Sequence, residues 1–134
     1  MPEEPQEPTV SMEEVIRRDG RYPLEAFGLL QEALSRAVQR HHGRAPNDAG
    51  SRHVSGSQLC LSLRDLACER WGMLARTVLH RWNIHSTRDI GEMVFLLVEH
   101  GFMRKTPQDR IEDFDDVFDF GHAFEEQYTF ETDK

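Results

Sequence analysis

Apolar residues recur at helical spacing through much of the chain, and this pattern limits most strongly what the chain can fold into. The clearest case lies between Asp89 and His100. Its apolar side chains follow one another at steps of one, three or four residues: Ile90, Met93, Val94, Leu97 and Val98. This spacing gathers them into one stripe along a helix. Similar spacing from Pro23 to His42 predicts a second long helix, and the whole pattern predicts a mainly α fold.

Start and stop signals predict where the other helices lie. Ser11 precedes two glutamates and opens a short helix that Gly20 ends. Ser55 stands three residues before a glutamine, a capping-box pattern, and it opens a helix that runs to about residue 71. A shorter helix follows over 74–82 and carries an apolar stripe of Leu74, Val78, Leu79 and Trp82. We expect a single α-rich domain of about five or six helices.

The region after residue 101 fits two interpretations. Residues 102–112 suit a small β-hairpin or an extended stretch, and a terminal helix would then cover roughly 114–128. Alternatively, the Thr106-Pro107 pair opens a further helix, because threonine caps helices well and proline is tolerated at their first position. The hairpin would make the domain winged-helix-like.

Length and composition narrow the class of protein. The chain has 134 residues, enough for one domain, and only two cysteines, too few for a disulfide scaffold. Its longest apolar run, 93–98, is far too short to cross a membrane. The acidic, proline-rich residues 1–10 suit a flexible tail, and because they lack an apolar stretch we expect no secretory signal. We expect a cytoplasmic protein with one domain over 11–131 and an exposed loop over 43–53.

The negative charge gathers at the C-terminal end. The formal net charge is −8, and residues 109–134 hold 10 acidic and 2 basic side chains. The same segment holds five of the eight phenylalanines, whereas disordered acidic tails are poor in aromatics. We expect most of it to dock on the body of the domain with its acids facing water. The acidic surface over 109–131 is then a candidate site for a protein partner, and mimicry of a phosphate backbone is a lesser alternative.

A second candidate site surrounds the capping box. Gly56 lies between Ser55 and Ser57 at a helix start, where free backbone N–H groups can bind an anion, and Arg52 and His53 precede them. Helix capping explains the same serine and glycine residues without a ligand.

The order of helices also permits nucleic-acid binding. A helix over 74–82, a turn, a helix over 89–100 and a hairpin follow the winged-helix order, with 89–100 as the recognition helix. Five basic residues could form the contact patch: Arg76, Arg81, Arg88, Arg104 and Lys105. The acidic net charge disfavours this alternative, because neutralised phosphates supply most of the affinity for DNA.

Catalytic and cofactor motifs are missing from the sequence. We find no nucleophile elbow and no glycine-rich phosphate loop, and we expect no cofactor. One cluster has helical spacing and would suit a metal-dependent enzyme: Asp116, Asp119, His122 and Glu126. Dimetal sites of this kind need a second half-motif from other helices, and none is found. Cys60 and Cys68 suit small core residues.

In several short segments, the sequence resembles a family of short uncharacterised proteins found mainly in planctomycetes and verrucomicrobia. The resemblance covers about residues 12–128 and rests on these segments: 19–22, 53–56, 77–82, 89–99, 105–109, 113–114 and Tyr128. It implies a single-domain protein but no activity, cofactor or site residue. Taken together, the sequence favours a non-enzymatic module for protein interaction or regulation. A winged-helix-like nucleic-acid binder and a metal-dependent enzyme are the alternatives.

Overall fold

The computed structural model describes residues 11–42, 54–104 and 109–120. These residues are mainly helical, as expected, and no strand occurs among them. The α-helices are α1 (Met12–Asp19), α2 (Leu24–His42), α3 (Gly56–Trp71), α4 (Ala75–Arg81) and α5 (Thr87–Glu99). Two short 3-10 helices, η2 (Gly72–Leu74) and η3 (Ile111–Phe114), complete the fold. The tail expected over 1–10 and the loop expected over 43–53 lie outside the described residues.

The helix ends confirm the capping signals of the sequence. Ser11 accepts a hydrogen bond from the backbone N–H of Glu14 at 3.1 Å, and Gly20 ends α1 with a φ of 78°. Ser55 and Gln58 form the reciprocal capping box at the start of α3, with bonds of 3.1 and 3.0 Å. These signals depend on residues within one turn of each other, so sequence alone suffices to find them.

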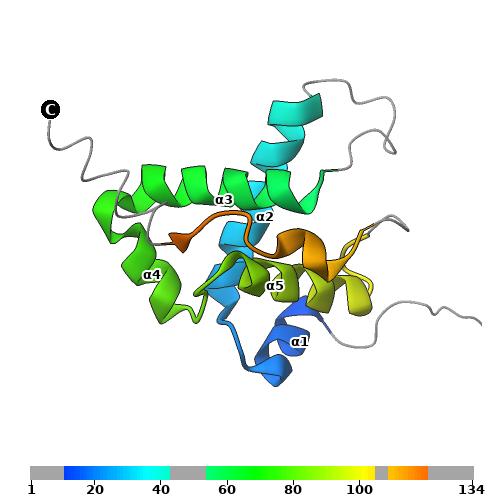
Figure 1. The fold of residues 1–134 in the computed structure, drawn as a ribbon. Helices are drawn as coiled ribbons and strands as arrows, with labels where there is room; N and C mark the ends of the chain where they lie inside the picture. Colours follow the sequence, from blue (N-terminus) through cyan, green and yellow to red (C-terminus); the bar gives the residue numbers. More distant parts are fainter. Residues whose placement is uncertain (1–10, 43–53, 105–108, 121–134) are drawn as a thin grey trace, which may run out of the picture.

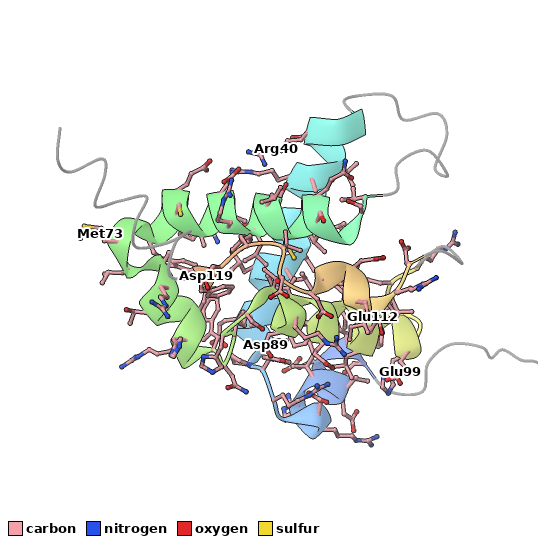
Figure 2. The ribbon with its side chains drawn as sticks, in the orientation of Figure 1. Arg40, Met73, Asp89, Glu99, Glu112 and Asp119 are labelled. Carbon is pink, nitrogen blue, oxygen red and sulfur yellow. The ribbon has the colours of Figure 1, made fainter. Side chains whose placement is uncertain are left out.

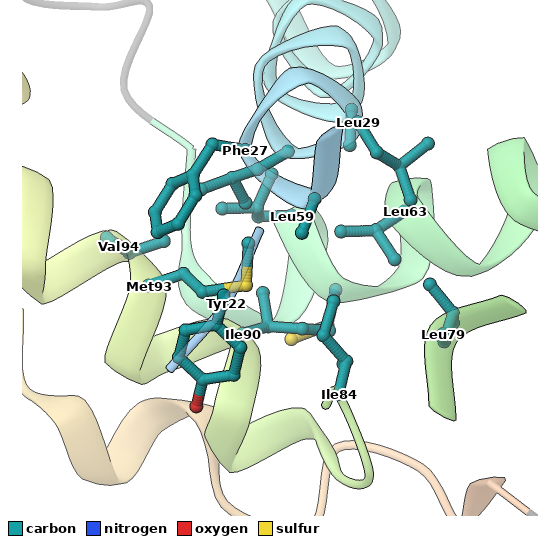
Figure 3. Close-up of a cluster of buried hydrophobic side chains, with 14 of the residues drawn as sticks. Tyr22, Phe27, Leu29, Leu59, Leu63, Leu79, Ile84, Ile90, Met93 and Val94 are labelled. Atoms are coloured by element: carbon teal, nitrogen blue, oxygen red, sulfur yellow. The ribbon is translucent and has the colours of Figure 1, made fainter. Parts of the chain in front are cut away.

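One hydrophobic core joins the helices. α2 packs against α3, and α5 lies below α3 in Figure 1, with α1 at the bottom. The centre of the core brings together residues from α2, α3, α4 and α5, several of them labelled in Figure 3. The largest fully buried apolar side chains are Phe27, Leu30, Cys60, Leu63, Leu79, Ile84, Ile90, Met93 and Leu97.

Ion pairs cross the outer side of the α2–α3 contact. Arg36 and Arg70 pair with Glu69 and Glu32 across the two helices, each at 2.7 Å. Arg36 follows Glu32 in α2, whereas its partner Glu69 precedes Arg70 in α3. The two helices therefore run antiparallel. These pairs lower the pKa of both glutamates. The pairing orients the C-terminal end of α3, from which η2 and α4 depart.

The region after α5 corrects the sequence interpretation. Gly101 ends α5 with a φ of 82°, and the N–H of Phe102 turns back to the carbonyl of Leu97 at 2.8 Å. The described part of 102–112, which omits 105–108, contains no strand, and the 3-10 helix η3 begins at Ile111. The expected hairpin is therefore not confirmed.

The terminal helix expected from residue 114 is also wrong over its first residues. Residues 115–119 are not helical, and Asp116 has a φ of 53°. Instead the Thr87 hydroxyl donates to the carbonyl of Phe114 and accepts from the N–H of Val117, which holds the segment against α5. The segment appears in orange in front of α5 in Figure 1. Residues 121–128 lie outside the described part of the chain.

Phe114 anchors this segment through two glycines. Its ring lies over Gly56 of α3 and Gly91 of α5. A Cβ at Gly91 would lie 2.7 Å from the Phe114 ring, closer than real Cβ atoms come to a neighbour. The sequence pattern of phenylalanines resembles a helix, but these long-range contacts decide the conformation.

Candidate functional site

An exposed apolar corner stands where α3 passes into α4. Gly72 takes a φ of 56° at the end of α3, and the chain then forms the 3-10 turn η2. Met73 and Leu74 in this turn are 64% and 63% exposed, the two most exposed large apolar side chains among the described residues. Figure 2 shows Met73 at the outer end of the molecule, pointing away from the core.

A shallow basic groove follows on α4. Arg76, Thr77, His80 and Arg81 line a depression of about 410 Å³. These positions are one, four and five residues apart, so they share one face of the helix. The opposite face carries Ala75 and Leu79, which are completely buried. The amphipathic pattern of α4 therefore anchors the helix on one side and presents two arginines on the other.

A second depression continues the surface beyond Arg81. It measures about 430 Å³ and lies between α1, the turn into α2 and the end of α4. Apolar atoms come from Trp82 and from Leu24, which is 47% exposed. The charged lining is mixed: Arg17 pairs with Glu13, which also lines the depression, and Arg21 pairs with Asp19 and Glu92. Arg81 lines both depressions, so the two form one continuous surface. We call this surface, from Met73 to Trp82 with Leu24, the α4 face.

The α4 face is basic in an acidic protein. Residues 70–88 contain four arginines, two histidines and no acidic residue, although the net charge of the chain is −8. Arg70 pairs with Glu32 at 2.7 Å and Arg88 with Asp115 at 2.9 Å. Arg81 makes no ion pair with any residue that the structure describes. Arg81 is exposed at the surface.

A polar network fixes the position of α4. The side-chain amide of Asn83, in the left-handed region with a φ of 69°, donates to the backbone carbonyl of Arg21 at 3.0 Å. Nε2 of His85 lies 2.9 Å from Oδ1 of Asn83, and the His80 and His85 rings meet edge to face at 4.1 Å. The network joins the end of α4 to the turn between α1 and α2.

Tyr22 and Asp89 complete that network. The Tyr22 hydroxyl donates to Oδ1 of Asp89 at 2.7 Å, and Oδ2 accepts the backbone N–H groups of His85 and Ser86 at 2.8 and 3.2 Å. Burial, together with the bond to the Asp89 carboxylate, raises the pKa of Tyr22. The phenol therefore stays neutral and acts as a structural donor. Asp89 is labelled in Figure 2.

In the candidate site around the capping box, the described residues Ser55 and Gly56 make structural contacts. The Ser55 hydroxyl accepts the N–H of Gln58, and Gly56 lies under the Phe114 ring. Ser57 is exposed beside them. These contacts favour helix capping over anion binding for Ser55 and Gly56. Arg52 and His53 lie outside the described residues.

The basic patch expected for nucleic acid is only partly assembled. Arg76 and Arg81 share the α4 groove, whereas Arg88 lies on α5 in ion pairs with Asp115 and Glu92. Arg104 is exposed beyond the end of α5, and Lys105 lies outside the described residues. Helix α5, the expected recognition helix, is covered along one side by η3.

The metal cluster expected on one helix face is not formed by its described members. Asp116 and Asp119 lie in a non-helical stretch, and His122 and Glu126 lie outside the described residues. Within the described part of the chain, no group of three or more histidine, cysteine or carboxylate residues is placed to hold a metal ion. Figure 2 shows Asp119 beside the start of α5.

The two cysteines are free thiols. Cys60 is completely buried, as expected of a core residue, and Cys68 is half-buried. Burial raises the pKa of the Cys60 thiol to about 12. Because a nucleophile must be the thiolate, Cys60 has no catalytic use at neutral pH.

Sequence reasoning missed the α4 face as a unit. It counted Leu74 with the buried stripe of its helix and placed Arg76 and Arg81 only in the nucleic-acid alternative. The available signal was the run of 19 residues without an acid in a chain with 24 acidic residues.

We compared the chain with known protein families, curated proteins and solved structures. No family model matches the chain, and no curated protein or solved structure is significantly similar to it. Among the described residues, no helix combines the length and the apolar character needed to cross a bilayer.

Proposed function

We propose that this protein is a non-enzymatic protein-interaction module that binds an acidic partner segment on its α4 face. The observation that carries the proposal is the order of surface types along α4. Exposed Met73 and Leu74 stand at one end, Leu24 and Trp82 at the other, and the basic groove lies between them. An acidic segment with apolar side chains complements all three parts.

The apolar ends supply the attraction that a protein partner needs. Full burial of a methionine or leucine side chain contributes roughly 1.5–3 kcal/mol. At exposures of 64% and 63%, burying Met73 and Leu74 contributes roughly 2–4 kcal/mol. A dissociation constant of roughly 100 µM needs about 5.5 kcal/mol beyond the entropic costs of association, so the other apolar end of the face and the charge contacts in the groove must supply the larger share. Such affinity suits a transient, regulatory contact.

The charge of the groove selects the partner. Exposed Arg81 attracts carboxylates, while the remainder of the acidic molecule repels them, so an acidic segment is steered to this one face. Nucleic acid is the second candidate, supported by the order of α3, α4, turn and α5, which is that of a winged helix. The exposed apolar corner favours a protein, because phosphate backbones offer it no apolar surface.

Fluorescence anisotropy tests the proposal. The probe is a labelled peptide rich in glutamate with leucine and phenylalanine side chains; its control replaces each glutamate by lysine. We expect binding of the acidic peptide only, and a loss of about tenfold or more in Arg81→Glu. Arg104→Glu makes the same charge change away from α4 and should bind as the wild type does.

Two outcomes would contradict the proposal. Equal losses in Arg81→Glu and Arg104→Glu would show a response to net charge without a defined site. Binding of a duplex DNA oligonucleotide, with a steep salt dependence and no binding of the acidic peptide, would favour the nucleic-acid candidate instead.

A further inference from the structure

The described chain ends beside the α4 face. Phe120, its last described residue, is 5% exposed, and it lines a depression of about 330 Å³ together with Arg76, Asp116 and Asp119. Arg76 also lines the basic groove. Figure 1 shows this end of the chain, in dark orange, close to α4. Residues 121–134 therefore begin next to the surface for which we propose an acidic partner.

The composition of residues 121–134 matches that partner. The segment carries four acidic side chains, at positions 125, 126, 131 and 133, and three aromatic ones, at 124, 128 and 130. Its basic side chains are one lysine and one histidine. Acidic and apolar groups alternate over a short distance, which is the chemistry that the basic groove and its apolar ends complement.

The segment is also long enough to reach every part of the face. Fourteen residues extend up to about 46 Å at roughly 3.3 Å each. Helix α4, with seven residues, is about 10 Å long. Reach therefore places no limit on contact between the segment and the groove.

We propose that residues 121–134 bind the α4 face of their own chain and compete with an external acidic partner. The inference rests on the proposed function, since it names the regulation of the same face. A short tether holds the segment at an effective concentration of roughly 1 mM. Against an intrinsic dissociation constant of roughly 100 µM, this lowers the apparent affinity for an external segment by about tenfold. The C-terminal segment is thus self-inhibitory.

Charge-neutralised full-length variants test the competition. Glu125, Glu126 and Glu131 are changed to glutamine in one variant, and Glu3, Glu4 and Glu7 in the matched control, so both gain the same charge. The probe is the labelled acidic peptide described above. We expect the C-terminal variant to bind it about tenfold more tightly than the wild type, and the N-terminal variant to bind it as the wild type does. Adding Arg81→Glu to the C-terminal variant should abolish the gain.

Each other result has a defined meaning. Equal affinity in all three proteins, still dependent on Arg81, would refute self-inhibition and leave the proposed function standing. No Arg81-dependent binding in any of them would refute the proposed function itself. An affinity gain that depends on protein concentration would refute contact within one chain, because the segment would then act between two copies. Circular dichroism checks that every variant keeps the wild-type helix content.

Discussion

Replacement of Gly91 by alanine tests how the segment after η3 is held on the helices. A Cβ at this position would lie 2.7 Å from Cγ and 2.8 Å from Cβ and Cδ2 of Phe114, whose ring is fixed between α3 and α5. Phe114 is buried, so the ring must move or the helices must separate. Overpacking of this kind costs about 1–3 kcal/mol, and loss of the whole ring contact costs up to about 5 kcal/mol.

The helix itself gains from the same change. Alanine is favoured over glycine inside a helix by about 1 kcal/mol. The net expectation for Gly91→Ala is therefore a destabilisation of up to about 2 kcal/mol from overpacking, and of up to about 4 kcal/mol if the ring contact is lost. Gly28 is the matched control, because it lies on the exposed side of α2 and a Cβ there meets no atom within 4 Å. We expect Gly28→Ala to stabilise the protein by about 1 kcal/mol.

Urea unfolding followed by circular dichroism measures both variants. The same substitution should move the free energy of unfolding in opposite directions at the two sites. A second step replaces Phe114 by alanine, which removes Cγ and Cδ2 beside the new Cβ. Gly91→Ala should cost less in that background than in the wild type, a coupling typical of residues in contact. Equal stabilisation by Gly28→Ala and Gly91→Ala would refute the reasoning, since it would show that no ring stands over Gly91.

Two further predictions follow from the described side chains. Tyr22→Phe removes the donor to Asp89 and should lower the free energy of unfolding by about 1–2 kcal/mol at neutral pH, measured by urea unfolding. Because the pKa of Tyr22 is raised in the folded state, its contribution is complete below the ordinary value of 10.0 and is lost as the pH rises further. The difference between wild type and Tyr22→Phe should therefore narrow above pH 10, by up to about 1.4 kcal/mol per pH unit, and a constant difference would contradict this account. For the cysteines, a thiol reagent at neutral pH should modify Cys68 in the native protein and Cys60 only after unfolding, because burial raises the pKa of Cys60 to about 12. Mass spectrometry of the peptides checks this order. Rapid labelling of Cys60 in the native protein would contradict the prediction, because it would show that the core around Cys60 opens to solvent.

The local signals of the sequence were good predictors of helix ends. Ser11, Gly20, Ser55 and Gly101 stand where the structure has caps or turns. A cap joins groups a few residues apart, so the residues that decide it are visible in one short stretch of sequence. The apolar periodicity of 90–98 was equally reliable, because a helix with one wide apolar stripe has only one way to bury it.

Predictions failed where distant residues decide the outcome. The helix expected from residue 114 had suitable phenylalanine spacing, yet Thr87 and Gly91 hold Phe114 at the end of η3, and residues 115–119 after it are not helical. Leu74 fitted the stripe of its helix, but the turn at Gly72 places it 63% exposed. Neither result depends on local propensity; both depend on what the rest of the chain packs against these residues.

The sequence by itself therefore determined the mainly helical class, several helix ends and the concentration of acid near the C-terminus. It also contained the run from 70 to 88, which has four arginines and no acidic residue, but it did not show that part of this run forms one surface. Only the tertiary structure decided that Arg76 and Arg81 share a groove and that Leu24 closes one end of the surface. The physical reason is that periodicity within one helix determines which of its residues can be buried together, whereas a surface between helices depends on how they pack.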